Sequence, residues 1–366
     1  MNKLRIMECF GGIGACSKAL ERLGIDYEIA DYVEIDKYAV KSFNAIHGTN
    51  FEPQDICKWD KDIEVDLIMH GSPCQDFSLA GKQAGGDKDS GTRSSLMYET
   101  IRIVEKLKPK YVIWENVKNL LSKKHRHNFD AYLETMEQLG YTNYYQILNA
   151  KDYGIPQNRE RVFTVSILGN EKFEFPLKQE LKLKLKDILE DDVDERYYLS
   201  NKMVKYISAN NEKWTGNNDK SIINKSVASA INTGEGSRRC DASNYISNQV
   251  EENFNLKGSS YLRDFGSKGK LQNKEYCDTL TASMGTGGGN IPIFQNNLRI
   301  RKLTPKECWR LMGFDDEDFE KAAKVNSNSQ LYKQVGNSIC VPVLIAILNN
   351  LLLDYNKDVI KLEKGE

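Results

Sequence analysis

Short apolar runs alternate with amphipathic stretches through residues 4–170, and this alternation restricts the chain to a small set of folds. We expect strands at residues 4–10, 29–35, 65–70, 111–115 and 161–168. We expect helices between them at residues 15–23, 95–107 and 129–139. Such alternation predicts a parallel, doubly wound α/β sheet, whose ligands bind at the carboxyl ends of the strands.

The pattern weakens after about residue 170, and residues 200–300 are rich in Asn, Ser and Gly. This window carries thirteen Lys and Arg against nine Asp and Glu, within a chain whose formal net charge is −1. The local excess suits a surface that faces a polyanion, although a solvated irregular domain would carry it too. Helical patterning resumes at residues 305–312 and 342–353.

The chain carries no sign of export or of a membrane span. Its first residues lack the apolar core of a signal peptide, and the longest apolar run, residues 339–348, is interrupted by Pro342. The eight cysteines include no Cys-x-x-Cys pair and lie away from the four histidines, so we expect no metal site. We therefore expect a cytoplasmic protein in which most cysteines are reduced and buried.

Polar or glycine-rich motifs follow the first expected strands. Residues 10–14 read Phe-Gly-Gly-Ile-Gly and open a helix, where glycines let a ligand approach the backbone. They lack the full Gly-x-Gly-x-x-Gly spacing of a dinucleotide site. Glu34 ends the second strand, where an acid commonly binds ribose hydroxyls, and Asp55 could hold an adenine edge. Each acid could equally well be an ordinary exposed residue of a polar turn, with no ligand.

Residues 71–78, Gly-Ser-Pro-Cys-Gln-Asp-Phe-Ser, form the strongest local signal. Cys74 follows an apolar strand and a proline, and it precedes a polar, glycine-rich loop. A free thiol has a pKa of about 8.5 and attacks as the thiolate, so a nucleophilic cysteine needs an activating environment. A buried structural cysteine is the alternative, and the polar neighbours argue against it.

Two further motifs bring charge to strand ends. Glu115 lies in Trp-Glu-Asn-Val, where a partly buried carboxyl could donate or share a proton. Arg159 and Arg161 enter the last expected strand two residues apart, so they share a face that suits an anionic or carbonyl-rich ligand. An exposed ion-pair cluster with Glu160 is the alternative interpretation.

The order of these motifs resembles the DNA (cytosine-5-)-methyltransferase family of bacteria and phages. The series continues through residues 301–314 and through Gln-Val-Gly-Asn-Ser at 334–338, so it spans nearly the whole chain. The resemblance implies a Rossmann-like, S-adenosylmethionine-dependent methyltransferase sheet with a smaller, irregular target-recognition domain. It implies a catalytic and cofactor-binding domain at residues 1–175, target recognition at 176–297, and a return segment at 298–366 that completes the catalytic domain.

The resemblance also implies a reaction, methylation of carbon 5 of a cytosine in a specific double-stranded DNA sequence. Cys74 would add to carbon 6 of a cytosine flipped out of the duplex, at a cost of a few kcal/mol. Glu115 would bond the ring nitrogen N3 and the exocyclic amine, and Arg161 would hold the carbonyl oxygen of the base. Arg159 would support the Cys74 region.

By the same resemblance, S-adenosylmethionine, which leaves as S-adenosylhomocysteine, would contact Phe10, Gly12, Ile13, Gly14, Glu34, Ile35, Asp55, Ile56, Pro73, Asn337 and Ser338. Glu34 would bind the ribose and Asp55 the adenine amine. Many family members carry an aromatic residue where this chain has Ile35, so the adenine would pack more loosely. DNA would contact Gln75, Ser78, Arg93, Arg238, Arg239, Thr279, Thr281, Ser283, Gly287 and Asn290.

Three other functions compete with this interpretation. A methyltransferase of the same fold that acts on a tRNA cytosine would carry a Cys-Phe-Thr signature, which this sequence lacks. An inactive DNA-binding module would not need Cys74, Glu115 and Arg161, and a nicotinamide dehydrogenase would need the missing glycine spacing. The resemblance implies a monomer with no membrane and no obligate protein partner. It leaves open the target sequence and whether a cognate restriction endonuclease accompanies the enzyme.

Overall fold

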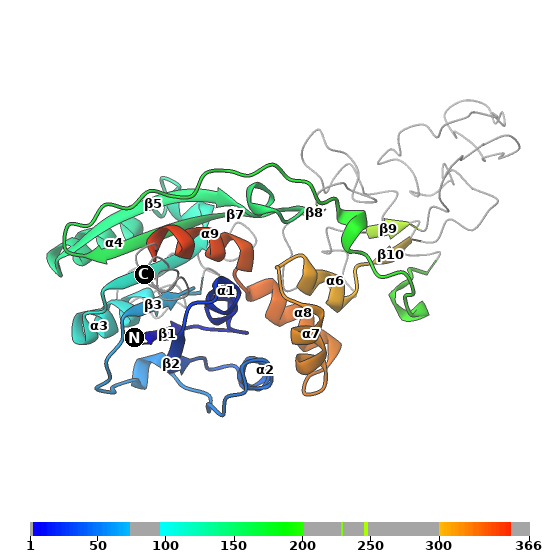
Figure 1. Cartoon of the computed structure of the whole chain (residues 1–366), viewed down its shortest axis with the longest axis horizontal. Coiled ribbons are helices and arrows are strands. Elements are labelled where there is room, and N and C mark those ends of the chain that lie inside the picture. The colour runs from blue at the N-terminus through cyan, green and yellow to red at the C-terminus, as the bar shows by residue number, and fades with distance from the viewer. Residues whose placement is uncertain (1–2, 74–95, 201–227, 230–244, 248–299, 353–366) are drawn as a thin grey trace, which may run out of the picture.

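A six-stranded mixed sheet organises the molecule, and the computed structural model describes residues 3–73, 96–200, 228–229, 245–247 and 300–352 (Figure 1). Its order is β2-β1-β3-β4-β7-β5. The bounds are Tyr27–Val33 for β2, Leu4–Cys9 for β1, Leu67–His70 for β3, Tyr111–Val117 for β4, Glu160–Leu168 for β7 and Tyr141–Asn149 for β5. The α/β class expected from the alternation of strands and helices is confirmed.

The expectation of a wholly parallel sheet is wrong for β7, whereas β5 runs in the same direction as β1 to β4. β1, β2, β3 and β4 are parallel to one another, whereas β7 runs antiparallel to both β4 and β5. β5 and β7 are joined by residues 150–159, which hold a single turn, η4 (Ala150–Tyr153), and the short strand β6 (Gln157–Asn158). Such a connection has no room for the crossover helix that a parallel pair requires.

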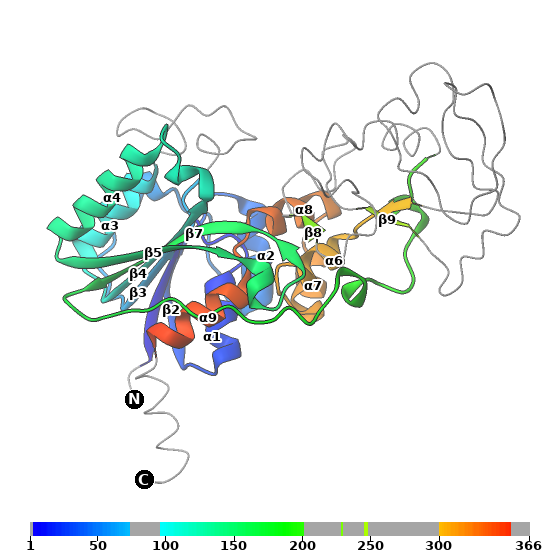
Figure 2. The same cartoon turned by 90° about the horizontal axis from the view of Figure 1, so that it is seen from above.

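Helices cover both faces of the sheet, because alternate strand residues point to opposite sides. One face contacts α1 (Ala15–Leu23) and α9 (Val341–Leu351), with Ile6, Met69 and Ile113 in its core. The other contacts α3 (Met97–Leu107) and α4 (Arg126–Gln138), with Met7, Ile68 and Val112 in its core. Figure 2 shows the two pairs of helices on opposite sides of the strands.

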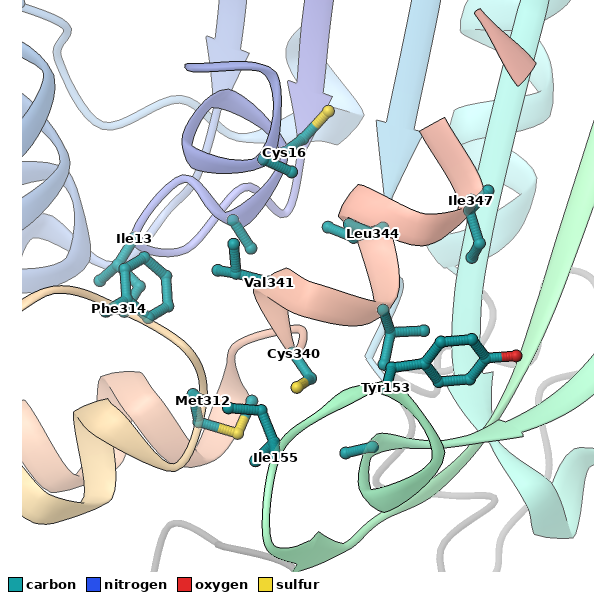
Figure 3. Packing of buried hydrophobic residues seen from close by; sticks show 14 of the residues in the cluster. Ile13, Cys16, Tyr153, Ile155, Met312, Phe314, Cys340, Val341, Leu344 and Ile347 are labelled. Carbon is teal, nitrogen blue, oxygen red and sulfur yellow. The ribbon is translucent and has the colours of Figure 1, made fainter. Parts of the chain in front are cut away.

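The end of the described chain returns to the first helix. α6 (Pro305–Arg310), α7 (Asp316–Ala323) and α8 (Asn328–Asn337) lead into α9. Figure 3 shows Val341 and Leu344 of α9 packed between α1 and the segment that carries Tyr153 and Ile155, in one buried cluster. This cluster therefore joins residues from the beginning, the middle and the end of the chain.

The remaining described elements are short or lie outside the sheet. α2 (Lys37–His47) follows β2 and begins at Asp36, whose carboxylate accepts a hydrogen bond from the Tyr38 N–H at 2.9 Å. The 3-10 turns are η1 (Ile56–Lys58), η3 (Lys118–Leu121), η5 (Leu185–Ile188) and η6 (Glu195–Tyr197). Two-stranded pairs join β6 to β8 (Ala228–Ser229) and β9 (Tyr245–Ser247) to β10 (Ile300–Lys302).

One described stretch, Asn328–Leu351, is long and apolar enough to cross a membrane, with a mean hydropathy of 1.5. In the structure 61% of its most apolar window is buried, and the stretch is divided into α8 and α9 around residues 338–340. The buried core helix of a soluble protein passes the same test of length and composition, so this stretch is weak evidence for a membrane span.

Candidate active site

A cavity of about 510 Å³ opens at the carboxyl ends of β1, β2, β3 and β4. Its wall combines residues from the loop after β1, the end of β2, the turn η1, the segment after β3, the end of β4, the start of β7 and one side of α8. The predicted site residues in this wall are Phe10, Gly12, Glu34, Ile35, Asp55, Ile56, Pro73, Glu115, Arg159, Arg161 and Asn337. The fold therefore brings together motifs that are more than 300 residues apart in the sequence.

Glu34 anchors the glycine-rich loop at one end of the cavity. Its carboxylate accepts hydrogen bonds from the N–H of Gly12 at 3.2 Å and from the N–H of Asp36 at 2.8 Å. Burial raises the pKa of Glu34, and these N–H donors offset part of the rise. Phe10 and Gly12 both have left-handed backbones, with φ values of 53° and 57°, so the loop makes a sharp turn between β1 and α1.

A ring stack behind the loop fixes its position. The Tyr32 hydroxyl donates a hydrogen bond to the Gly12 carbonyl at 2.6 Å, and the Tyr32 ring stacks on Phe43 with centroids 3.8 Å apart. A Cβ at Gly11 would lie 2.7 Å from the Tyr32 ring, so a larger residue there would push the loop away from β2. Sequence reasoning did not single out Tyr32.

An ion pair joins α8 to the mouth of the cavity. The ammonium group of Lys333 lies 2.6 Å from the Asp36 carboxylate. Burial opposes ionisation of Asp36, but the hydrogen bonds from Lys333 and from the Tyr38 N–H outweigh it, so the pKa of Asp36 is lowered. Ile35, between these charged groups and Glu34, is 69% exposed and offers an apolar surface to a ligand.

Glu115 and Arg161 face each other across neighbouring strands at the other end of the cavity. Arg161 Nε lies 3.0 Å from Glu115 Oε1, and both side chains are mostly buried. The pairing depends on the direction of β7, because the antiparallel register places Arg161 beside Val117 at the end of β4. Glu160 instead pairs with Lys118 at 3.1 Å, so the three charges do not form the exposed cluster considered as an alternative.

Arg159 ties β7 to the end of α8. It is 4% exposed, and its guanidinium donates hydrogen bonds to the carbonyl oxygens of Gly336 at 3.3 Å and Ser338 at 2.8 Å. Its backbone N–H also donates to Asn149 Oδ1 at 3.0 Å. Arg159 and Arg161 both line the same cavity, as expected from their spacing, and Arg161 pairs with the Glu115 carboxylate there.

The segment that leads to Cys74 is held by β4. Trp114 Nε1 donates a hydrogen bond to Ser72 Oγ at 3.0 Å, and Asn116 Nδ2 donates to the Ser72 carbonyl at 3.3 Å. Gly71, Ser72 and Pro73 line the cavity. The predictions that lie outside the described residues are Cys74, Gln75, Ser78, Arg93, Arg238, Arg239, Thr279, Thr281, Ser283, Gly287 and Asn290.

Three predicted cofactor contacts do not line the cavity. Ile13 is fully buried in the core against α1, Gly14 forms the left-handed start of α1, and the Ser338 carbonyl accepts a hydrogen bond from Arg159. These residues support the wall from behind. Wall residues that were not predicted are Val33, Asp36, Ala39, Gln54, Gly71, Ser72, Leu96, Val117, Lys333, Gln334 and Gly336. Five of them, Val33, Asp36, Gln54, Ser72 and Gly336, directly adjoin a residue that was predicted, so position in the sequence was the available signal for these.

The described cysteines have little nucleophilic character. Cys9, Cys16, Cys308 and Cys340 are buried, and burial raises the pKa of Cys340 to about 12 and that of Cys16 well above its usual range. Cys57 is exposed, and its pKa is also raised, first by burial and then by Asp55. Within the described ranges, no group of three or more His, Cys, Asp or Glu side chains could hold a metal ion.

Comparison with known families shows which family of proteins this chain belongs to. Residues 4–352 match the sequence model of the family described as C-5 cytosine-specific DNA methylase. The chain belongs to this family. The resemblance drawn from the motifs is confirmed, and the protein is a DNA (cytosine-5-)-methyltransferase, an enzyme that methylates carbon 5 of cytosine in DNA.

Similar DNA methyltransferases occur in bacteria and in phages. The chain is 36% identical to the type II methyltransferase M2.ScrFI of Lactococcus lactis subsp. cremoris, over 95% of this chain and 99% of that protein. It is 34% identical to the orphan methyltransferase M.SPRI of Bacillus phage SPR, over 98% of this chain and 100% of that protein. The methyltransferase thus matches these relatives along their full lengths.

Solved structures confirm the fold of the methyltransferase. The Entamoeba histolytica methyltransferase EhMeth superposes with a TM-score of 0.69 at 17% identity, over 97% of this chain and 99% of that one. The S. pombe Dnmt2 methyltransferase superposes with a TM-score of 0.65 at 21% identity, over 97% of this chain and 100% of that one. At such low identities the likeness concerns the fold alone.

Proposed function

We propose that the methyltransferase modifies a cytosine within a specific sequence of double-stranded DNA, using S-adenosylmethionine and a covalent bond from Cys74 to carbon 6 of a flipped base. The observation that carries this proposal is the shared cavity. Glu115 and Arg161 lie at one end of it, Glu34 lies at the other, and Pro73, which precedes Cys74 in the sequence, also lines it. A base and a methyl donor could therefore meet in one cavity.

The cavity wall suits an adenosyl group. Its volume falls in the range of roughly 300–1,000 Å³ that is usual for small-molecule sites. Glu34 offers a carboxylate to ribose hydroxyls, and Phe10, Ile35 and Ile56 offer apolar surface to a purine. When bound, S-adenosylmethionine supplies the methyl group and becomes S-adenosylhomocysteine. Ile13, Gly14 and Ser338 act in this proposal through the wall residues they support.

The charged pair suits the chemistry expected of Cys74. As the Cys74 thiolate bonds to carbon 6, negative charge develops at N3 and O2 of the cytosine, and carbon 5 becomes a nucleophile. Glu115 shares a proton with N3 and accepts a hydrogen bond from the exocyclic amine, and Arg161 donates to O2, so groups fixed before the reaction stabilise that charge. After methylation, carbon 5 loses its proton to a base, the bond from sulfur to carbon 6 breaks, and the thiolate returns. Arg159 keeps α8 against this end of the site.

The partners and location follow from the same proposal. Residues 176–297 read the target sequence and hold seven of the ten DNA contacts predicted above, whereas Gln75, Ser78 and Arg93 contact DNA from the catalytic domain. The enzyme acts as a monomer in the bacterial cytoplasm. Some relatives carry type II names and others orphan names, so both a cognate restriction endonuclease and a solitary enzyme fit the family. Bisulfite sequencing of DNA from cells that express the enzyme would identify the target.

A transfer assay tests the substrate and the nucleophile together. The purified protein is incubated with S-adenosylmethionine labelled in its methyl group and with either genomic DNA or tRNA. Label is expected in DNA alone, and Cys74→Ser is expected to lose at least a thousandfold in rate because a hydroxyl adds poorly to the ring. Binding of S-adenosylhomocysteine by Cys74→Ser, measured by calorimetry, is the control for folding. Transfer to tRNA alone would overturn the proposal.

A trapping experiment tests the covalent step by itself. DNA that carries 5-fluorocytosine in place of cytosine cannot lose its carbon 5 substituent as a proton. The enzyme is therefore expected to remain attached and to migrate as an SDS-stable adduct in the presence of S-adenosylmethionine. Cys74→Ser should form no adduct. An active wild-type enzyme that forms none would contradict the role of Cys74.

A further inference from the structure

The turn η1 forms part of the cavity wall and is closed by few hydrogen bonds of its own. Asp55 and Ile56 line the cavity there, and the Asp55 side chain accepts a hydrogen bond from the Cys57 N–H at 3.0 Å. The turn is a single three-residue 3-10 helix, closed by the Lys58 N–H to Asp55 and the Trp59 N–H to Ile56. So short a helix is not stable alone, so groups outside it must hold its shape.

Arg102 of α3 holds the turn from outside the cavity. Its Nη1 donates a hydrogen bond to the Trp59 carbonyl at 2.9 Å, and its Nη2 donates to the Ile56 carbonyl at 3.0 Å. Its Nε donates to Glu99 on the same helix at 2.9 Å, which fixes the plane of the guanidinium. One planar group thus bridges two backbone carbonyls of the turn, a geometry that a lysine cannot reproduce.

Asp31 of β2 holds the same segment from the opposite side. It is 1% exposed and accepts hydrogen bonds from Trp59 Nε1 at 2.6 Å and from Gln54 Nε2 at 2.9 Å. Lys61 completes the group, with its ammonium 2.8 Å from the Asp31 carboxylate. Asp31 therefore anchors the two ends of the segment to the sheet, while Arg102 anchors the peptide groups between them.

We propose that Arg102 is a positioning residue for the cofactor, which presets Asp55 and Ile56 for the adenine end by clamping the carbonyls of η1. Arg102 is not in the cavity wall and so acts only through the turn. Without the clamp, the turn samples several conformations, and binding must then order it. This inference rests on the proposed use of S-adenosylmethionine.

The clamp also links the turn to a second part of the cavity wall through α3. α3 begins after Leu96, which lines the cavity, and Arg102 lies further along the same helix. The helix therefore contacts the cavity directly at its start and indirectly, through η1, along its length. A shift of α3 would move both walls together.

Calorimetric titration with S-adenosylhomocysteine tests the proposal on the full chain. Arg102→Gln is expected to weaken binding about tenfold, the loss expected for one hydrogen bond from a charged donor. Arg102→Lys, which can reach one carbonyl, should lie between Arg102→Gln and the wild type. The KM for S-adenosylmethionine should rise in parallel, while kcat at saturating cofactor and DNA should stay within about twofold.

Lys106→Gln is the matched control. Lys106 lies on the same helix and pairs with Asp60 in the same segment, but it contacts an exposed side chain rather than the carbonyls of the turn. The affinity of Lys106→Gln for S-adenosylhomocysteine should equal that of the wild type. Equal affinity in Arg102→Gln, or a loss of kcat as large as the loss of affinity, would overturn the positioning role. A wild-type chain that fails to bind S-adenosylhomocysteine would overturn the proposed cofactor and this inference with it.

Discussion

Glu8 is a buried charged residue near the carboxyl end of β1, among apolar neighbours. It is 2% exposed, and its carboxylate accepts hydrogen bonds from the backbone N–H of Ser17 at 3.0 Å and from the Ser17 hydroxyl at 2.5 Å. Burial raises the pKa of Glu8 to about 7, because the Ser17 hydrogen bonds compensate for it only in part. Glu8 thus ties β1 to the first turn of α1, across the loop that lines the cavity.

This pKa predicts how stability varies with pH. Because the pKa of Glu8 lies at about 7 in the fold against 4.5 ordinarily, its contribution is complete below about pH 4.5 and is lost as the pH rises through 7. The free energy of unfolding of the wild type, minus that of Glu8→Gln, should fall by about 2.5 kcal/mol between pH 5 and pH 8. Urea unfolding of both proteins across this range measures the difference.

Subtracting the unfolding free energy of Glu8→Gln from that of the wild type cancels the contributions of other buried groups that titrate. His70, whose pKa burial lowers to about 3, acts in the opposite sense, because its contribution is lost as the pH falls below its ordinary 6.5. His70 is present in both proteins, so its effect cancels. A difference between wild type and Glu8→Gln that is constant with pH would show that Glu8 is ionised throughout.

At the scale of an element, α1 begins and ends at glycines in the left-handed conformation. Gly14 has φ 80° and Gly24 has φ 67°. A Cβ at Gly14 would lie 2.1 Å from His47 Nε2 and 2.8 Å from the Phe43 ring, whereas nothing lies within 4 Å of one at Gly24. The two ends therefore share a backbone requirement and differ in the space around them.

The two glycines make a matched pair of variants. Gly24→Ala should cost about 1 kcal/mol, the usual penalty of a left-handed alanine. Gly14→Ala should cost about 3 kcal/mol, because it must also displace His47 and Phe43. Since Phe43 supports Tyr32, which holds Gly12, Gly14→Ala should also weaken S-adenosylhomocysteine binding. Urea unfolding and calorimetry measure the two effects, and equal losses at both glycines would contradict this account.

The elements themselves were predicted with uneven success. The helix at residues 15–23 and the strands β1, β3, β4 and β7 lie where the apolar periodicity placed them, with ends that differ by a few residues. α2, β5, α7 and α8 were not predicted. β5 was missed because its sequence is rich in tyrosine and shows no clear alternation of apolar and polar residues. Its burial pattern is also irregular. Sheet position, rather than local pattern, makes it a strand.

At the scale of the whole molecule, a buried ion pair joins the two ends of the chain. Lys18 on α1 lies 3.1 Å from Asp318 on α7, and both side chains are almost fully buried. Asp315 lies 3.0 Å from the same ammonium, and it also pairs with Arg22 at 2.6 Å. Together with the apolar contact between α1 and α9, these charges fix the returning segment against the sheet.

Removal of one partner should therefore destabilise the entire fold. Lys18→Met leaves Asp318 buried without its cation and should cost about 3–5 kcal/mol in urea unfolding. The double variant with Asp318→Asn should lose less than the sum of the single variants, since it removes both charges. Lys321→Met is the control, because Lys321 pairs with the exposed Glu317 and should cost less than about 1 kcal/mol. Additive losses for Lys18 and Asp318 would contradict the coupling.

The sequence by itself determined the α/β class, the order of the motifs and the family, because these depend on local periodicity and on short residue patterns. It did not determine the direction of β7. Had β7 been parallel to β4, its amino end with Arg159 and Arg161 would lie at the opposite edge of the sheet from Glu115. Only the tertiary structure decided that the antiparallel strand returns Arg161 to within 3.0 Å of Glu115. A strand has the same side-chain period in either direction, so pairing with its neighbours must set its direction.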